Sequence, residues 1–198
     1  MSVTALGIDP DSYDTGWGIV RYWDRWTRPA CLAMGVVSVP KKLKIRQRVQ
    51  AMCDLLAYWE LPEIEIDLII VEGQTIYEDM KGRNPNALIH VAQVAGAAAA
   101  GAVANAAYDT RPRLVIPEPR TWKRQTPKRA HQAHVCRKLD WGFEKKGSTD
   151  NGYVVPEFPE HRPVPQGADS FKPAAFKHVM DGVGLAYWGA STSALGRL

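Results

Sequence analysis

The sequence predicts an α/β fold in which a mixed five-stranded sheet, led by an antiparallel hairpin, is flanked by helices. Three strand-like segments open the chain, and segments with helical and strand-like spacing then alternate towards the C-terminus. At 198 residues the chain is long enough for one hydrophobic core, so a single domain spanning residues 1–198 is the expected organisation.

The first three expected strands are short apolar or β-branched runs separated by turn-forming residues. Residues 3–9 and 15–23 flank a turn rich in Pro, Asp and Ser, which predicts a hairpin. Residues 30–39 are rich in β-branched residues and are expected to add a third antiparallel strand.

The middle of the chain is expected to add two helices and two strands. Apolar residues recur at helical spacing over residues 42–59, which predicts an amphipathic helix closed by Pro62. Residues 66–71 are a continuous apolar run, as expected for a central strand covered on both faces. The alanine-rich stretch predicts a closely packed helix over residues 84–108, and residues 114–116 are expected to form a short strand.

The C-terminal third is expected to contain two helices joined by a long loop. A compact basic helix is expected from about residue 127 to residue 139. Residues 141–173 have no sustained period and are dense in Gly and Pro, which predicts a long loop or flap inserted in the domain. The last helix is expected over residues 173–190, and it begins with a proline suited to a first helical turn.

Positive charge is concentrated in one segment of the chain. Residues 111–146 contain eleven Lys or Arg against three acids, a local net charge of +8, so the rest of the chain carries −4 of the total of +4. This basic segment favours a polyanion such as nucleic acid as the partner, and a solvated basic face is the alternative.

Cysteine usage and the apolar runs favour a cytosolic protein. Cys31, Cys53 and Cys136 are widely spaced and odd in number, which fits a reducing compartment better than a disulfide framework. The N-terminus is expected to enter a strand directly, without the regions of a secretory signal. Residues 92–107 are expected to be too short and too weakly hydrophobic to span a bilayer.

Two of the expected strands end in an acidic residue. Asp9 follows the apolar run at residues 6–8, and Glu72 follows the run at residues 68–71. If these strands are parallel neighbours, both carboxylates emerge at the carboxyl edge of the sheet, where open α/β sheets bind ligands. For each acid taken alone, a role as turn former or helix cap is the alternative.

The last expected helix carries His178 and Asp181 on a stripe that is otherwise apolar. Packing this stripe on the sheet would desolvate both groups, and an unpaired buried carboxylate costs several kcal/mol. A divalent cation shared with Asp9 and Glu72 would offset that cost. A local His–Asp hydrogen bond on a half-exposed face is the alternative.

These four side chains would provide an oxygen-rich metal site. Hard cations such as Mg²⁺ and Mn²⁺ prefer carboxylates, waters and phosphate oxygens, which favours them over structural zinc and favours a phosphodiester as the substrate. With two ions roughly 3.5 to 4 Å apart, one would activate water and the other would stabilise the leaving oxygen.

Four stretches of the chain resemble motifs of the RuvC-type Holliday junction resolvases, which belong to the RNase H-like superfamily. Residues 7–18 are similar to the first motif, residues 71–74 to the glutamate motif, residues 92–96 to the central helix and residues 178–186 to the terminal helix. The resemblance covers most of the chain, and its motifs follow one another in the expected order.

The resemblance implies an RNase H-like fold, a homodimer, and Mg²⁺-dependent paired incisions near a four-way junction that leave ligatable nicks. It implies that Asp9, Glu72 and Asp181 are carboxylate ligands of the metal, and that His178 stands where the family has aspartate or histidine. The expected enzyme is therefore an endodeoxyribonuclease of DNA recombination and repair, acting on branched DNA in a bacterial cell or a phage-infected host.

Residues 117–123 resemble the stretch that precedes the family's DNA-binding lysines. The resemblance implies that Lys123 and Lys128 contact phosphates, and Arg124 and Arg129 beside them are further candidates for DNA contact. Solvated surface cations are the alternative.

Three departures from the family pattern concern DNA selectivity rather than nuclease chemistry. Residues 124–127 replace a glycine-containing turn before the basic helix. Gly73 stands where a larger polar residue is common, and the insertion at residues 141–173 is unusually long.

Two aromatic features have two interpretations each. Tyr77, which follows Ile76 after the glutamate motif, is a candidate wedge against an unstacked base, with a place in the core as the alternative. The aromatic and basic cluster between Arg21 and Arg28 either touches DNA arms or forms only a hairpin tip.

Two other functions are compatible with parts of the sequence. A non-catalytic, structure-specific DNA-binding module would keep the fold without the reaction. Actin-like and sugar-kinase ATPases also open with an Asp followed by a Gly-containing hairpin. They need further phosphate-binding glycine loops and a two-domain cleft for which this chain is short.

Overall fold

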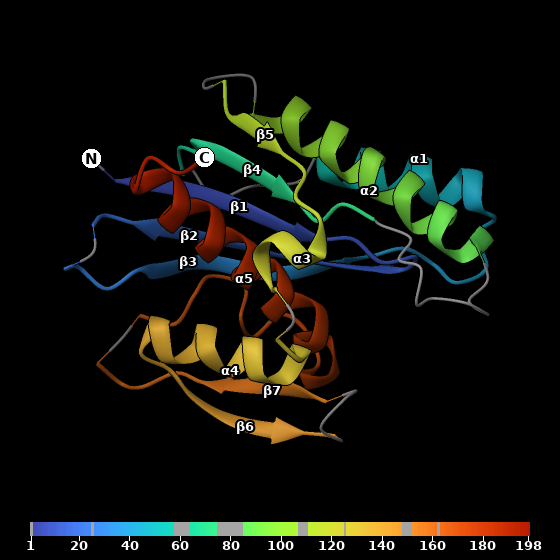
Figure 1. The fold of residues 1–198 in the computed structure, drawn as a ribbon. Helices are drawn as coiled ribbons and strands as arrows, with labels where there is room; N and C mark the ends of the chain where they lie inside the picture. The colour runs from blue at the N-terminus through green and yellow to red at the C-terminus, as the bar shows by residue number, and fades with distance from the viewer. Residues whose placement is uncertain are drawn as a thin grey trace.

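The structure is a computed structural model in which a five-stranded sheet lies at the centre of the molecule (Figure 1). It describes residues 2–24, 26–57, 64–74, 85–106, 111–124, 126–147, 152–161 and 163–198. The strand order is β3-β2-β1-β4-β5; β1, β4 and β5 are parallel, and β2 is antiparallel to both of its neighbours. The strands are β1 (Val3–Asp9), β2 (Asp14–Tyr22), β3 (Ala30–Ser38), β4 (Leu68–Val71) and β5 (Arg113–Val115). The predicted mixed sheet led by a hairpin is confirmed.

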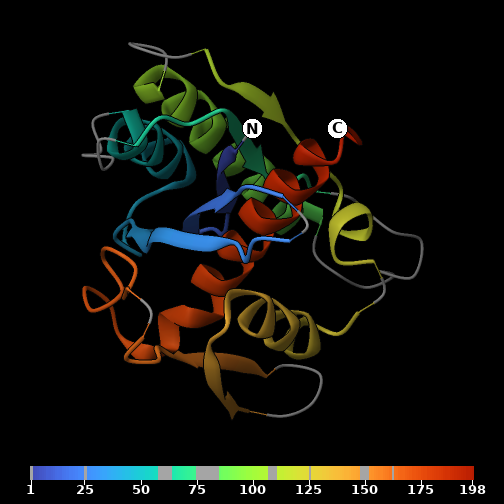
Figure 2. The same cartoon turned by 90° about the vertical axis from the view of Figure 1, so that its left-hand side faces the viewer.

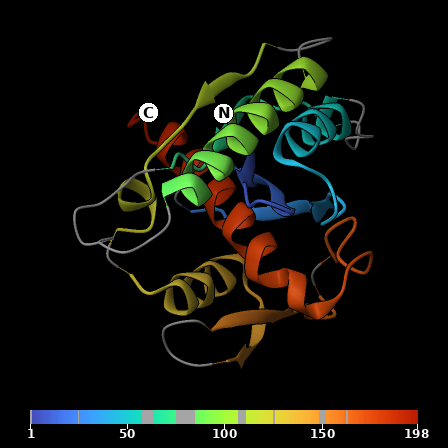
Figure 3. The same ribbon diagram turned by 90° about the vertical axis from the view of Figure 1, so that its right-hand side faces the viewer.

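Helices cover both faces of this sheet (Figures 2 and 3). On one face α1 packs against α2, and on the other α5 lies across β1 and β2, with α4 packed against α5. The four-residue helix α3 is shorter than any sequence period can reveal, and it was not predicted. The helices are α1 (Ile45–Ala57), α2 (Pro85–Ala106), α3 (Pro119–Trp122), α4 (Lys128–Leu139) and α5 (Phe176–Ala194), the last preceded by a 3-10 turn at Pro173–Ala175.

Each strand sends alternate side chains to the two faces of the sheet. In β1, Leu6 and Ile8 join the apolar cluster under α1 and α2, whereas Ala5 joins the cluster under α5. In β4, Ile69 faces α1 and α2, and Ile70 faces α5. The central strands are therefore buried on both sides, which is why they read as continuous apolar runs in the sequence.

Helix α1 has the amphipathic pattern that its sequence predicts, with one polar exception. Its residues Met52 and Leu56 are fully buried. The end of the predicted helix, with Pro62, lies outside the described residues. The exception is Arg48, whose Nη1 donates to the Ser12 carbonyl at 3.2 Å. Its guanidinium also lies 4.5 Å from the centroid of the Tyr13 ring. Through these two contacts α1 stabilises the loop that follows β1.

Helix α2 is more apolar than the sequence analysis expected. Its segment Asn86–Asn105 has a mean hydropathy of 1.6 and is, by length and composition alone, able to cross a membrane, so the expectation for this stretch is wrong on that point. In the structure the helix packs against α1 and β4, and Val94 and Ala98 are buried there. Small side chains permit this contact, because a Cβ on Gly101 would lie 2.5 Å from the Cys53 carbonyl oxygen.

Residues 141–173 are not the loop without secondary structure that the sequence predicts. β6 (Gly142–Lys146) and β7 (Tyr153–Glu157) form an antiparallel hairpin, and β7 packs against α4 and α5. These strands have five residues each and lack regular alternation, so their Gly and Pro surroundings dominated the prediction. Further along the same segment, Gln166 forms a parallel bridge with Ala33 of β3.

Candidate active site

Asp9 and Glu72 lie side by side at the carboxyl edge of the sheet. Asp9 is the last residue of β1, and Glu72 directly follows β4, whose Val71 pairs with Ile8 in parallel register. The Glu72 backbone N–H donates to the Ile8 carbonyl at 3.0 Å, which continues the pairing to the acids. By strand alternation both side chains belong to the face that α5 covers. The juxtaposition predicted from two strand ends is present in the structure.

Glycines bring α5 into backbone contact with the sheet beside these acids. A Cβ on Gly7 would lie 2.2 Å from the Gly182 carbonyl oxygen, and a Cβ on Gly16 would lie 2.2 Å from the carbonyl carbon of His178. Gly16 is the cross-strand partner of Asp9. Any side chain at Gly7 or Gly16 would therefore push α5 away from the carboxylates.

This close approach places two side chains of α5 next to the sheet acids. His178 Nδ1 lies 3.5 Å from Asp9 Oδ2, and His178 Nε2 lies 3.5 Å from Asp11 Oδ2. His178 and Asp181 are 8% and 1% exposed, so both are buried as the apolar stripe of the sequence predicts. Asp11 was not singled out from the sequence, although it lies within the first motif.

Lys123 and Lys128 reach into the same cluster. Lys123 Nζ lies 3.0 Å from Glu72 Oε1 and 3.5 Å from Asp181 Oδ2, and Lys128 Nζ lies 2.7 Å from Asp181 Oδ2. The family resemblance implied that both lysines contact DNA phosphates, which stays a prediction. In the structure their ammonium groups neutralise buried carboxylates, because α3 and the start of α4 pass beside the carboxyl edge of the sheet (Figure 1).

Two neutral donors complete the cluster, and sequence reasoning missed both. The Trp122 indole Nε1–H donates to Glu72 Oε1 at 3.1 Å, and Gln132 Nε2 donates to Asp181 Oδ1 at 2.8 Å. The sequence offers one sign of these donors: a tryptophan and a glutamine lie near the two lysines. That segment was interpreted only through its positive charge.

Burial and charge divide the three carboxyl groups into two kinds. Burial, reinforced by the Asp181 carboxylate, raises the pKa of Asp9 to about 6. Burial, reinforced by Asp9, raises the pKa of Glu72 to about 8. For Asp181, burial acts in the same direction, but Lys123 and Lys128 outweigh it and lower the pKa. Asp181 is therefore the carboxylate that stays ionised throughout the neutral range.

The donor set fits a hard divalent cation. Three carboxyl groups and one imidazole converge, and burial followed by the charge of Lys128 lowers the pKa of His178, which favours the neutral imidazole that binds metal. His178 Nε2 is buried without a hydrogen-bond partner among the described residues. In that part of the chain, however, no three donors stand together as a ready group of ligands. The carboxylates that a cation would bind form ion pairs with the lysines.

In the metal-free protein, the free energy of unfolding is expected to fall as the pH rises from about 6.5 to about 8. Over this range the raised pKa of Glu72 means that the folded state keeps a proton that the unfolded state has released, and one pKa unit corresponds to about 1.4 kcal/mol. Below about pH 6.5 the lowered pKa of buried His131, about 4, acts in the opposite direction to the raised pKa values of Asp9 and Glu72. Glu72→Gln should remove most of this slope and stabilise the protein at pH 8 by on the order of 2 kcal/mol. Urea unfolding in a chelating buffer measures both effects.

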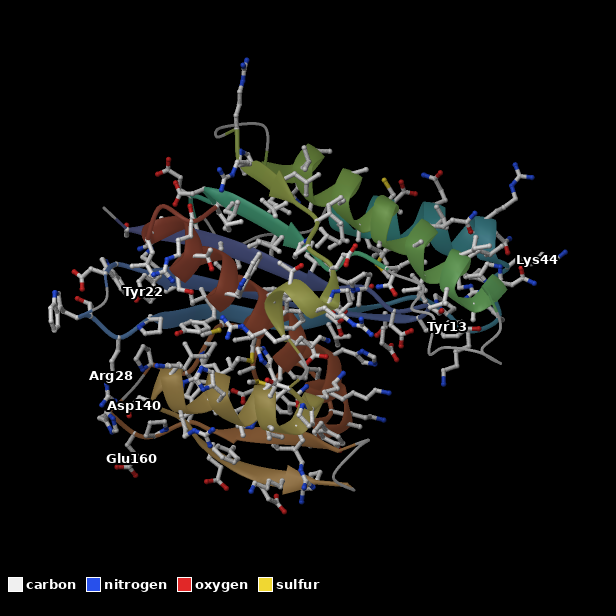
Figure 4. All side chains as sticks on the ribbon, in the orientation of Figure 1. Tyr13, Tyr22, Arg28, Lys44, Asp140 and Glu160 are labelled. Carbon is white, nitrogen blue, oxygen red and sulfur yellow. The ribbon has the colours of Figure 1, made fainter. Side chains whose placement is uncertain are left out.

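A matched control is Glu160→Gln, an exposed acid distant from the cluster (Figure 4). This variant should unfold with the wild-type pH dependence. A wild-type stability that rises between about pH 6.5 and pH 8 would contradict the raised pKa of Glu72.

The remaining predicted DNA-binding residues differ in their surroundings. Arg124 is exposed in the turn before α4 and has a left-handed backbone with φ of 56°, the conformation for which the family's glycine would be suited. Arg129 Nη1 donates to the Gly147 carbonyl at 3.0 Å, which ties α4 to the β6–β7 hairpin. Tyr77 and Ile76 lie outside the described residues.

The aromatic and basic cluster between Arg21 and Arg28 lies at the opposite end of the sheet from the carboxylates. Tyr22 pairs with Val3, the first residue of β1, and Figure 4 shows Tyr22 and Arg28 far from Tyr13. Arg28 forms an ion pair with Asp140. Of the two interpretations, the hairpin tip is the one that this position supports.

Two grooves flank α4 close to the carboxylate cluster. One has a volume of about 470 Å³ and is lined by Lys123, Arg124 and Arg137 together with Trp122 and Trp188. The other, of about 240 Å³, is lined by Arg129, Arg137 and Lys145. No carboxylate is among the described residues that line either groove, so the basic segment of the sequence forms a basic surface beside the site.

The fold and the site together define a class of protein. A hairpin-led mixed sheet, crossed by a C-terminal helix that adds donors to acids at two strand ends, is an RNase H-like α/β fold with a carboxylate centre. Thermus thermophilus RuvC in complex with a Holliday junction substrate has the same fold, with 18% sequence identity, a TM-score of 0.63, and coverage of 100% of this chain and 98% of that chain. A further Thermus thermophilus RuvC structure matches with 17% identity, the same TM-score and the same coverage.

The sequence itself matches the family of crossover junction endodeoxyribonuclease RuvC over residues 5–110. The chain belongs to this family. A search of curated proteins gives no significant match. The family match ends before α3, so it covers Asp9 and Glu72, whereas the lysines and α5 are placed beside them by the structure alone.

Proposed function

We propose that this chain is a metal-dependent endonuclease that resolves Holliday junctions and other branched DNA by paired, symmetric incisions. The observation that carries the proposal is the convergence of Asp9, Glu72, His178 and Asp181 at one sheet edge in a chain of the RuvC family. A cluster of buried acids at a strand end, with basic grooves beside it, suits a substrate with negatively charged phosphates.

The four converging side chains would hold Mg²⁺, with Mn²⁺ able to substitute, and two ions are proposed for each site. When bound, such ions activate water for attack on the scissile phosphate and stabilise the leaving oxygen. The protein contributes the positions of the ligands. Trp122 and Gln132 fix two carboxylates by hydrogen bonds, and the glycine contact between α5 and β1 sets the distance between the two groups of ligands.

Lys123 and Lys128 have a second task in this proposal. A bound cation would replace them as partners of Glu72 and Asp181, which frees two ammonium groups at the mouth of the site. Their flexible side chains would then meet the phosphates on either side of the cut. The lysines that pair with the carboxylates would in this way pair with the phosphates of the substrate.

We also propose a homodimer and a single domain spanning residues 1–198. Paired incisions on opposite strands of a junction require two active sites, which a two-fold dimer provides. The exposed side of α2, with Ile89 at 50% exposure among small residues, is the surface proposed for the contact. A cytoplasmic location is part of the same proposal.

The test is cleavage of labelled four-way, Y-shaped and linear DNA of matched sequence in Mg²⁺ and in Mn²⁺. The expected result is a pair of symmetric nicks in the four-way junction, sealed by DNA ligase, with linear duplex left intact. If linear duplex is cut as fast as the four-way junction, the proposed junction selectivity is wrong. Absence of any cutting with either metal would refute the nuclease.

One observation favours a second candidate, a non-catalytic DNA-binding module of the same fold. Lys123 and Lys128 already satisfy Glu72 and Asp181, so the cluster is neutralised without metal. This candidate predicts tight junction binding with no nicks under any metal condition. The family match points to a nuclease family and gives no support to an actin-like or sugar-kinase ATPase.

Junction affinity is expected to depend on the arginines of the two grooves. If Arg124 and Arg137 each neutralise one phosphate, replacing either by glutamine should lower the slope of log affinity against log salt by about 1. Fluorescence anisotropy between 50 and 200 mM salt, roughly the range over which such contacts act, measures the slope.

Arg111→Gln removes the same charge from an exposed position two residues before β5, at the edge of the sheet opposite the carboxylates. Its slope should equal that of the wild type. A reduction of the same size in Arg111→Gln would mean that net charge, rather than the grooves, sets the salt dependence.

A further inference from the structure

Gln132 is a polar side chain that is fully buried at the meeting point of three elements. It belongs to α4 and is 0% exposed. Its Nε2 donates to Asp181 Oδ1 at 2.8 Å and to the Lys177 carbonyl at 3.1 Å, both on α5. Its Oε1 accepts from the Val154 backbone N–H of β7 at 3.0 Å. The amide group is thus bonded at its nitrogen twice and at its oxygen once.

Such complete bonding in a buried place restricts the side chain to one conformation. A buried amide without partners costs free energy, so the three bonds favour the one rotamer that makes all of them. Asp181 is then held by different donors at its two oxygens, Oδ1 by Gln132 and Oδ2 by Lys123 and Lys128.

The difference between these donors matters once a cation enters. The lysine contacts supply positive charge and compete with a cation for Oδ2. The contact from Gln132 is neutral and approaches the other oxygen, so it is compatible with a bound cation. Partners of this kind orient a ligand without taking its charge, and their loss commonly weakens metal binding.

The β6–β7 hairpin holds Gln132 from its other side. Val154 is 0% exposed, and its N–H points to Gln132 rather than to the partner strand or to water. The hairpin, for which the sequence suggested only a loop, therefore supplies one of the three bonds that fix the amide.

We propose that Gln132 is a positioning residue that holds the Asp181 carboxylate in its metal-binding orientation, and that the β6–β7 hairpin, through the Val154 amide, holds Gln132. The inference rests on the proposed function in one respect, the role of Asp181 as a metal ligand. It adds a residue of α4 and a chain segment outside the family match to the machinery of the site.

The first test is Gln132→Met, which keeps the length of the side chain and removes its donor and acceptor. Mn²⁺ affinity of the DNA-free protein, measured by calorimetry, should weaken by about 10- to 100-fold. Cleavage at saturating junction should fall by a similar factor, while junction affinity in Ca²⁺ should stay within about threefold of wild type, because Gln132 does not reach DNA.

Gln50→Met is the matched control. Gln50 Nε2 also donates to a carboxylate, Asp54 Oδ1, at 2.8 Å, but it is exposed on α1 at the other face of the sheet. This variant should keep the Mn²⁺ affinity, the cleavage rate and the junction affinity of the wild type. Gln132→Met with unchanged Mn²⁺ affinity and unchanged rate would overturn the proposal.

A second measurement needs no variant and covers the case in which Gln132→Met does not fold. In ¹⁵N-labelled wild-type protein, Mg²⁺ titration should shift the Gln132 side-chain amide and the Val154 backbone amide at the same metal concentration. Two unmoved signals at saturating Mg²⁺ would overturn the proposal.

The outcomes separate this inference from the proposed function. A wild type that binds Mn²⁺ but cuts no DNA, with weaker binding in Gln132→Met, supports positioning and refutes the nuclease. A wild type that cuts junctions, with a variant that matches it in Mn²⁺ affinity and rate, supports the nuclease and refutes positioning. A wild type that neither binds Mn²⁺ nor cuts refutes both.

Discussion

Replacement of Asp9 or Asp181 by asparagine is expected to abolish junction cleavage while leaving junction binding intact. The loss should reach roughly a thousandfold or more, beyond the 10- to 100-fold that removal of a merely supporting partner costs. An amide oxygen lacks the negative charge with which these carboxylates would hold a cation. Single-turnover cleavage at saturating protein measures the rate, and anisotropy in Ca²⁺ measures binding.

The two variants should differ in stability, which serves as an internal check. Asp9→Asn removes a carboxyl group whose pKa is raised by burial and by Asp181, so it should not destabilise the metal-free protein at neutral pH. Asp181→Asn leaves Lys128 without its partner at 2.7 Å and should lower the free energy of unfolding.

Asp54→Asn, an exposed acid of α1, is the matched control for both and should cut at the wild-type rate. If Asp9→Asn and Asp181→Asn are folded and cut as fast as the wild type, the proposed site is wrong. If both lose binding along with cleavage, the carboxylates act in DNA recognition and the metal proposal loses its main support.

Gly16→Ala is expected to lower the free energy of unfolding by about 3 kcal/mol or more, the upper range for overpacking. The added Cβ would lie 2.2 Å from the His178 carbonyl carbon and 2.3 Å from its oxygen. The atoms that clash with the new Cβ are backbone atoms of α5. They cannot move aside unless α5 or the central hairpin shifts as a whole and breaks other contacts. A loss of this size should lower the Tm of a chain of this length by about 6 to 12 °C.

Gly96→Ala is the control for this substitution. Gly96 lies in α2, is exposed, and has no atom of its own chain within 4 Å of the position that a Cβ would take. Because the exposed side of α2 is also the proposed dimer contact, the unfolding of both variants is measured at a concentration at which the chain is monomeric. Alanine should there raise stability by about 0.5 to 1 kcal/mol, because it is the better helix former. Calorimetric or urea unfolding of both variants decides the matter. A Gly16→Ala protein as stable as the wild type would mean that α5 does not lie against the sheet as described.

Features that depend on local periodicity were predictable from the sequence. The apolar runs before Asp9 and Glu72 gave the central strands, and a parallel pairing then puts both acids at one edge. The stripe that contains His178 and Asp181 correctly predicted that both are buried, although α5 is buried on most of its sides, with Val179, Met180 and Val183 also in the core. In each case a single element carries the pattern, and few topologies can join such elements.

Features that depend on a partner far along the chain were not predictable. A lysine has the same appearance in a sequence whether it faces water, phosphate or a buried acid, so the pairing of Lys123 and Lys128 with buried carboxylates could not be predicted. Trp122 and Gln132 have hydrogen-bond partners 50 and 49 residues away, and no spacing rule connects such pairs. The glycines at 7, 16 and 18 were a usable signal, because their alternation marks a face without side chains.

The bridge between Gln166 and Ala33 has a consequence for self-association. Met34 N–H donates to the Gln166 carbonyl and Gln166 N–H donates to the Leu32 carbonyl, so the outer strand β3 is capped at its middle. An uncapped outer strand is a template on which another chain adds by hydrogen bonding, the first step towards aggregates. At the other margin, β5 has only three residues. The bridge from the long insertion thus leaves less of this outer strand open to pairing with a second chain.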